Sequence, residues 1–349
     1  MLADNFADLE FVDRCGDVFT LNQATSPNLF AFREEALQPP GICTKATVRI
    51  YPTTDDEQGV LVPFSSFDEA VRFVRELGVR RIGLAAAILG DHYLSAFTSP
   101  SQELAERTRK VLTETLGVKF AVAVVGDEYA IAAVRSMTRA LIDGRLFRAL
   151  MLGLPKLAEG QWLELLTDFA TDRPPYEILC REELYPLVET VLNPSPANIA
   201  SAVEEDLRAF YEDLYSKPEM TDLVWLTMFR ILSSRMSRHK HYFVFVLYVP
   251  LDDIPLIDRI IEGFRTIGEK HEISHEFGFL TPLDFGKRGI LEYDYYVDQT
   301  DPAERARVAA LLADIDPWLG QLCREERAIK TFKFVLGQGC ARKEAFLYA

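Results

Sequence analysis

The clearest pattern in the chain is the strict alternation in GILEYDYYVD, residues 289–298. Apolar and aromatic side chains (Leu291, Tyr293, Tyr295 and Val297) fall on every second position, with mostly polar ones between them. A period of two is typical of a strand with one buried face. This segment is therefore predicted to be a strand.

Strand and helix patterns alternate before residue 140. Strands are predicted at 41–52, 59–64, 81–89 (as a strand or other buried segment) and 119–127. Ser66 and Glu69 make a capping box for a helix, and Gly78 is predicted to end it. Its apolar face comprises Phe67, Ala70, Val71, Val74 and Leu77. Helices are also predicted at 102–116 and from 128 to about 142.

A second block begins at about residue 237. Strands are predicted at 242–249, 273–282 and 289–298, with helices from Asp253 to about Thr266 and from Pro302 to about Leu319. A β-α-β-β-α order favours an antiparallel sheet with helices on one face. The predicted fold class is therefore α+β, with antiparallel sheets flanked by helices, ferredoxin-like β-α-β-β-α elements and a helical connector.

Four regions follow from this pattern. Residues 1–52 are predicted to be a docking arm, 53–140 a first α/β half, and 237–349 a second α+β half with a helical tail. Residues 141–236 are punctuated by prolines and contain no strand pattern, so a helical connector is expected there.

Composition narrows the possible partners. The 349 residues carry a net charge of −15 without a dense basic run, which argues against nucleic acid. No signal peptide or apolar run of membrane-spanning length is legible. Five scattered cysteines without a CxxC pair favour a reducing compartment, and we expect a cytoplasmic protein.

The motif His271-Glu272-x-x-His275 matches the zinc hydrolase pattern H-E-x-x-H. That pattern needs a helix, whereas Gly263 and Gly268 precede the motif and no helical stripe follows it. In a strand the two histidines would stand roughly 13 Å apart. We interpret the match as accidental, keep a zinc hydrolase as a remote alternative, and predict no metal site.

Two segments resemble one protein family. GICTKATVRIYP followed by VLVPFSSFDEAVRFVREL is similar to FAD-linked oxidases of the vanillyl-alcohol oxidase type, where the flavin domain hands over to the cap. FGFLTPLDFGKRGILEYDYYVDQTDPAE resembles their cap strands. The resemblance covers roughly residues 10–330. The match to the family's G-I-V-T implies Gly41, Ile42, Cys43 and Thr44 as cofactor-binding candidates.

The chain also departs from that family. In the family, a glycine-rich pyrophosphate loop precedes these segments. We expect this loop to be missing from the chain, together with the family's closing D-P-x-G-I-L-N-P-G element. EALQPPG, residues 35–41, replaces the glycine-rich turn near the flavin, and its two prolines offer fewer backbone N–H groups.

The resemblance therefore implies a cap subunit that is not active alone. FAD would be bound mainly by a partner chain, and the substrate would be a small alcohol, hydroxy acid or phenol. The alternative is a structural or assembly subunit that has lost catalysis. Further oligomerisation is compatible with either.

The candidate catalytic residues cluster around the late sheet. Tyr293 and Tyr295 are predicted to contact a substrate, with Arg288 pairing to a carboxylate or phenolate. His239 and His241 precede or begin the neighbouring strand and could reach the same cavity. Packing of half-buried strand aromatics is the competing interpretation for both tyrosines.

Overall fold

The computed structural model describes residues 6–13, 15–22, 42–50, 56–98, 102–143, 240–298, 300–326 and 329–334. Gly41, His239 and nearly all of the predicted connector lie outside these residues. The predicted division of the chain into four regions thus remains a prediction. Within the described part, no helix is both long and apolar enough to cross a membrane.

Two β-α-β-β-α-β units follow each other along the chain. The first comprises β4 (Gln58–Phe64), α2 (Phe67–Arg80), β5 (Ala85–Gly90), β6 (Phe120–Gly126), α5 (Glu128–Met137) and β7 (Ile142–Asp143). The second comprises β8 (Lys240–Pro250), α12 (Ile254–Lys270), β9 (Ser274–Leu283), β10 (Arg288–Asp298), α13 (Pro302–Glu325) and β11 (Lys330–Phe334). The predicted α+β class with antiparallel strands and flanking helices is confirmed.

The two units share one strand order and form one sheet. The eight strands run β11-β8-β10-β9-β5-β6-β4-β7, so each unit has the order 4-1-3-2 of its own strands. The second strands of the units pair antiparallel, with Ile88 opposite Leu280 and Leu89 opposite Phe279. The sheet is therefore a structural duplication, which the sequence did not reveal as a repeat.

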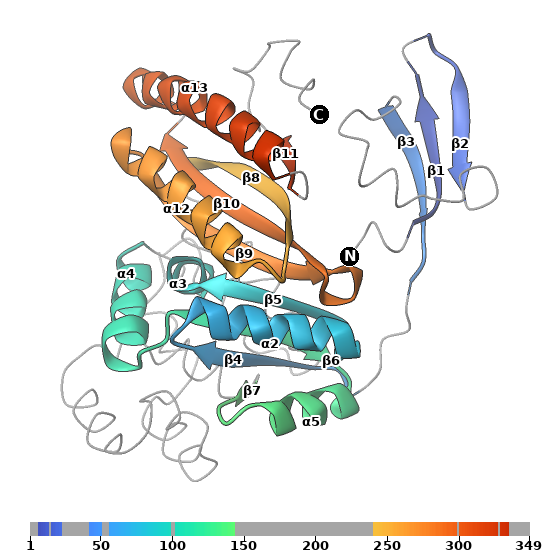
Figure 1. Ribbon diagram of the computed structural model, residues 1–349, viewed down its shortest axis with the longest axis vertical. Helices are drawn as coiled ribbons and strands as arrows, with labels where there is room; N and C mark the ends of the chain where they lie inside the picture. Colours follow the sequence, from blue (N-terminus) through green and yellow to red (C-terminus); the bar gives the residue numbers. More distant parts are fainter. Residues whose placement is uncertain are drawn as a thin grey trace, which may run out of the picture.

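A smaller antiparallel sheet precedes this one. Its order is β2 (Val18–Asn22), β1 (Phe6–Val12) and β3 (Ile42–Val48). Figure 1 shows these three strands as a separate sheet. β3 confirms the strand predicted from GICTKATVRIYP but ends at Val48, before the predicted end, while residues 41 and 51–52 lie outside the described residues.

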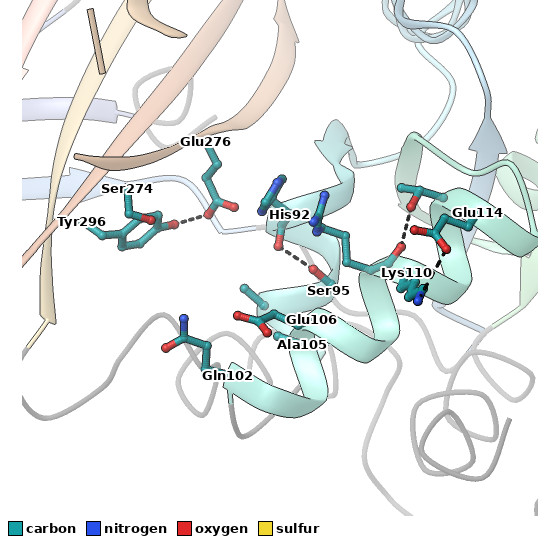
Figure 2. Close-up of a pocket in the computed structure, with 13 residues that line it drawn as sticks. His92, Ser95, Gln102, Ala105, Glu106, Lys110, Glu114, Ser274, Glu276 and Tyr296 are labelled. Atoms are coloured by element: carbon teal, nitrogen blue, oxygen red, sulfur yellow. Dashed lines mark hydrogen bonds and ion pairs between the residues drawn. The ribbon is translucent and has the colours of Figure 1, made fainter. Parts of the chain in front are cut away.

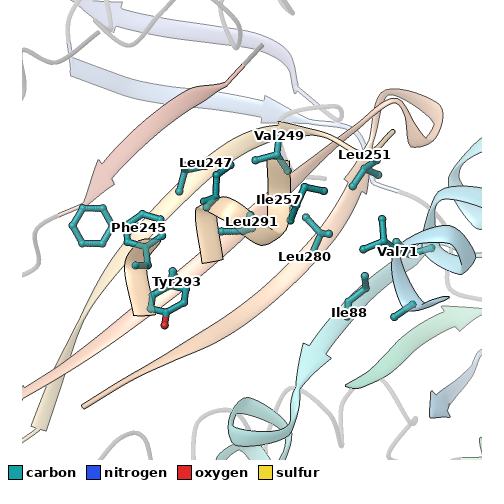
Figure 3. Close-up of a cluster of buried hydrophobic side chains, with 14 of the residues drawn as sticks. Val71, Ile88, Phe245, Leu247, Val249, Leu251, Ile257, Leu280, Leu291 and Tyr293 are labelled. Carbon is teal, nitrogen blue, oxygen red and sulfur yellow. The ribbon is translucent and has the colours of Figure 1, made fainter. Parts of the chain in front are cut away.

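One hydrophobic core runs across both units on the face that α2, α12 and α13 cover (Figure 3). Val71 of α2 and Ile88 of β5 belong to the same cluster as Leu280 and Leu291 of the second unit. Side chains that pair across strands share a face, so the paired residues Leu291–Leu247 and Tyr293–Phe245 point to these helices. The alternation predicted for β10 is confirmed.

Several helix ends differ from prediction. α2 continues past Gly78 to Arg80. Gly78 packs against the backbone of Gly286, where a Cβ would lie only 2.8 Å from the Gly286 nitrogen, which explains the glycine at this position. α12 likewise continues through Gly263 and Gly268 to Lys270. These glycines make room for neighbouring rings and do not end the helices. α5 ends at Met137, and Ile142 then pairs with β4 as part of β7.

The connection between β5 and β6 contains an unpredicted helix. α3 (Asp91–Thr98) follows β5 directly, before α4 (Gln102–Lys110). α4 then passes into a π-turn at Val111–Thr115, where the Leu116 N–H donates to the Val111 carbonyl at 3.0 Å. In the second unit the same connection is the single turn Asp284–Gly286. The two units therefore differ most at this connection.

The glycines of α12 give a test of the helix packing. A Cβ on Gly263 would lie 2.1 Å from the Trp318 ring of α13, so we expect Gly263→Ala to lower the free energy of unfolding by about 1–3 kcal/mol. Gly320→Ala is the control, since its Cβ meets nothing closer than 3.5 Å and alanine favours a helix by up to about 1 kcal/mol. Urea denaturation would measure both, and equal effects would contradict this packing.

Candidate functional site

A cavity of about 510 Å³ lies on the sheet face opposite α12 and α13 (Figure 2). Its walls come from α3, α4, the π-turn and the adjoining ends of β9 and β10. The lining side chains described are those of His92, Ser95, Ala96, Gln102, Ala105, Glu106, Arg109, Lys110, Thr113, Glu114, Ser274, Glu276 and Tyr296. The first unit thus supplies the helical wall and the second unit the sheet wall.

Glu276 and Tyr296 form the sheet wall. Glu276 is opposite Asp294 and Ser274 is opposite Tyr296, so these side chains share the face that the helices leave open. Glu276 is only 6% exposed, and the Tyr296 hydroxyl donates a hydrogen bond to its Oε1. A buried carboxylate and a phenol are therefore held together at the cavity.

Two further carboxylates lie on the same sheet face as this pair. Glu292 and Asp294 are buried on the same face of β10. Gly278 makes room for them, because a Cβ there would lie 3.0 Å from Glu292 Oε1 and 3.1 Å from Asp294 Oδ2. Within the described residues, no group of three His, Cys, Asp or Glu side chains is arranged to hold a metal ion.

His92 stands on the helical wall. The residue is exposed on one side, but partial burial lowers the pKa of its ring below the usual value. The charge of Arg109 also lowers this pKa, whereas the charge of Asp91 raises it. Arg109 faces Asp91 at 3.6 Å. The lowered pKa favours neutral His92 near pH 7, a form that can accept a proton.

The predicted catalytic tyrosines lie on the other face of the sheet. Tyr293 and Tyr295 are 2% and 0% exposed, and both pack against Phe264 of α12. The Tyr295 hydroxyl donates to the Phe264 carbonyl at 2.6 Å, and the Tyr293 hydroxyl lies 2.8 Å from His275 Nδ1. Burial raises the pKa of each phenol. Neither lines the cavity, and their catalytic role stays a prediction.

The other candidates whose side chains the structure describes do not lie beside Tyr293 and Tyr295. Arg288 begins β10, roughly 25 Å along the strand from Tyr296. The backbone of His241 pairs with Val297, beside Tyr296, and its side chain lies outside the description, as does all of His239. Ile42, Cys43 and Thr44 are exposed on β3, in the separate small sheet.

The H-E-x-x-H segment is not helical. α12 ends at Lys270, Glu272 has a φ of +53°, and His275 lies in β9. His271 Nε2 contacts Asp314 at 2.6 Å, whereas His275 faces Tyr293. Lys270 and then His271 lower the pKa of Asp314. The histidines thus have separate partners, and the helical geometry of the zinc alternative is absent.

Sequence reasoning missed Glu276, Tyr296 and His92 as members of one site. A signal for Tyr296 was present, since the polar face of GILEYDYYVD contains Glu292, Asp294 and Tyr296. That face was expected to meet solvent, because an alternating strand pattern does not show what covers its polar side. His92 had no signal, because the helix that contains it was not predicted.

Comparison with known proteins gives structural similarities only. No family profile and no curated protein sequence matches the chain. It is similar to 4-ethylphenol oxidase from Gulosibacter chungangensis in an isoeugenol complex (TM-score 0.46, 14% identity, 94% of this chain and 57% of that one). It is also similar to p-cresol methylhydroxylase with substrate bound (TM-score 0.46, 11% identity, 89% and 55%).

A third similar structure is alkyldihydroxyacetonephosphate synthase (TM-score 0.38, 12% identity, 94% of this chain and 52% of that one). The chain spans little more than half the length of each of these three proteins.

Two histidines predict how stability depends on pH. Burial lowers the pKa of His275 as well as that of His92. Below about pH 6.5 the unfolded chain therefore binds more protons than the folded one. We expect the free energy of unfolding to fall as the pH falls from about 6.5, and to fall less in His275→Gln. Urea denaturation at pH 7.5, 6.5 and 5.5 would measure this, and identical slopes would contradict it.

The buried Tyr293 hydroxyl predicts a cost for its removal. Tyr293→Phe leaves His275 Nδ1 without this partner, so we expect the free energy of unfolding to fall by about 1 kcal/mol. Tyr129→Phe is the control, because Tyr129 is 77% exposed. Thermal and urea unfolding would compare them. If Tyr293→Phe keeps full stability but abolishes turnover, the catalytic prediction is supported instead.

Proposed function

We propose that this chain is the substrate-binding cap subunit of a heteromeric FAD-dependent oxidoreductase, whose FAD-binding domain is on a separate chain. The cavity would bind the substrate, a small alcohol, hydroxy acid or phenol. The observation that carries the proposal is the buried Glu276–Tyr296 pair on the wall of the cavity, with His92 and Arg109 on the helical wall.

The size and lining of the cavity support a binding function. Cavities of about 300–1,000 Å³ are typical of small-molecule sites. A purely structural subunit gains stability by filling such a space with apolar side chains. Keeping polar groups around an open volume favours the enzyme subunit over the structural alternative.

The residues of the cavity suit proton transfer from a hydroxyl group. Oxidation of an alcohol removes the hydroxyl proton and a hydride from the neighbouring carbon. We assign Glu276 as the group that accepts the proton, with Tyr296 orienting its carboxylate through the hydrogen bond. Neutral His92 is a second proton acceptor on the facing wall. Arg109, paired with Asp91, would orient the substrate oxygen.

When bound, FAD would supply the two-electron acceptor. A pyrophosphate needs converging N–H groups or cations. Ile42, Cys43 and Thr44 lie in an extended strand, with the Thr44 hydroxyl donating to Glu10 at 2.9 Å. Their backbone N–H groups do not converge, so these residues do not fit the pyrophosphate. The proposal accordingly assigns the pyrophosphate to the partner chain.

β3 is the surface that we assign to this partner. Among the described strands it lies at the edge of the small sheet, and Ile42 is 75% exposed. An edge strand with exposed apolar side chains is suited to pairing with another chain.

Purification of the tagged chain from its native host would test the assembly. We expect a second polypeptide to co-purify together with flavin absorbance near 450 nm, on the order of one FAD per pair of chains by the proposed division of the fold. A chain that purifies without a flavoprotein would contradict the proposed function.

The variant Glu276→Gln would test the chemistry within that complex. We expect turnover to fall by about 10²–10⁴-fold, because an amide cannot accept the proton, while flavin content and partner stay unchanged. Glu325→Gln is the control, since Glu325 is exposed at the end of α13 and bonded to Gln321. Equal turnover in both variants would remove Glu276 from the mechanism.

A further inference from the structure

The described wall of the cavity is polar on every side. Hydroxyl, amide and carboxylate groups come from α3, α4, the π-turn, β9 and β10. Apart from the rings of His92 and Tyr296, only Ala96 and Ala105 among the described lining residues are apolar. A phenol-binding site needs apolar and aromatic walls along both faces of the ring, which these residues do not provide.

Donors and acceptors are interspersed along this wall. The Gln102 amide supplies both kinds of group, and Glu106 and Glu276 supply acceptors. The Thr113 hydroxyl donates to the Arg109 carbonyl at 2.9 Å, so its oxygen can accept a hydrogen bond from a ligand. An alcohol with several hydroxyl groups matches such a wall, because each hydroxyl donates once and accepts as well.

The cations of the described wall already face carboxylates. Arg109 lies 3.6 Å from Asp91, and Lys110 lies 3.9 Å from Glu114. A hydroxy acid would place its carboxylate among Glu106 and Glu276 and compete for these cations. The charges of the wall therefore favour a neutral ligand over an anionic one.

The π-turn bears directly on this wall. Five residues, Val111–Thr115, occupy the turn, and Val111 and Thr115 are buried while Thr113 and Glu114 line the cavity. One extra residue in a helical turn rotates the following side chains by about 100° relative to a regular α-helix. Such π-turns are frequently found at functional sites. Here the turn presents a hydroxyl and a carboxylate together.

We propose that the cavity binds a neutral, hydroxyl-rich alcohol, a polyol, and not a phenol or a hydroxy acid. This assignment deepens the proposed function and rests on it for the statement that the ligand is oxidised. Thr113 and Gln102 bind ligand hydroxyl groups, while Glu276 receives the hydroxyl that loses its proton.

Calorimetric titration of the full chain, in the complex in which it is purified, would test this. The probes are xylitol, 4-methylphenol and lactate, with ligand-observed NMR for weak binding. We expect xylitol to bind more tightly than either of the others. Tighter binding of 4-methylphenol or of lactate, or no binding of xylitol, would overturn the assignment.

Matched variants locate the binding. We expect Thr113→Val to weaken xylitol binding about five- to tenfold, the effect of one hydrogen bond, without weakening 4-methylphenol binding. Thr266→Val makes the same change on the exposed side of α12, and xylitol affinity should stay unchanged. Gln102→Met at the start of α4 gives a second, exposed test position. Xylitol affinity that is unchanged in both cavity variants would overturn the proposal.

The two proposals fail separately. A complex that contains flavin but prefers 4-methylphenol removes the polyol assignment and leaves the oxidoreductase. A chain that binds xylitol through Thr113 but purifies without a flavoprotein removes the oxidoreductase and leaves the polyol site.

Discussion

The pairing of β5 with β9 is the constraint on which the rest of the structure depends. It joins the same strand of two similar units, so that eight strands share one sheet and one core. Phe277 strengthens the seam, since its ring contacts those of Phe67 of α2 and Phe120 of β6, which also contact each other, and Gly90 leaves room for it. A larger side chain at Gly90 would meet this ring and the Phe277 carbonyl at 3.1 Å. The two units therefore cannot shift relative to one another without losing this packing.

The cavity exists only because of this seam. Its helical wall belongs to the first unit and its sheet wall to the second, so neither unit contains the site alone. The two units differ at the connection that contributes the helical wall of the cavity. The connection between β5 and β6 contains α3, α4 and the π-turn, whereas the corresponding connection of the second unit is a single turn. The long connection covers the face that α2 and α12 leave open, and it encloses polar groups there.

The two faces of β10 separate packing from chemistry. Tyr293 and Tyr295 point toward α12, where burial raises the pKa of each phenol and where both hydroxyls have hydrogen-bond partners. Tyr296 points to the other face and holds Glu276. Side chains only one residue apart thus have different surroundings, because the period of a strand is two. Which tyrosine meets a substrate is decided by the element that covers each face.

The sequence by itself determined the α+β class, most strands, and the buried faces of α2 and β10, because apolar periodicity is a local property of the chain. It also argued against a helical zinc motif, although its reason was partly wrong, since Gly263 and Gly268 lie inside α12. Only the tertiary structure decided that two units share a sheet and that Glu276, Tyr296 and His92 line one cavity. These residues are brought together by long-range strand pairing, and the seam of two paired positions leaves no local pattern in the sequence.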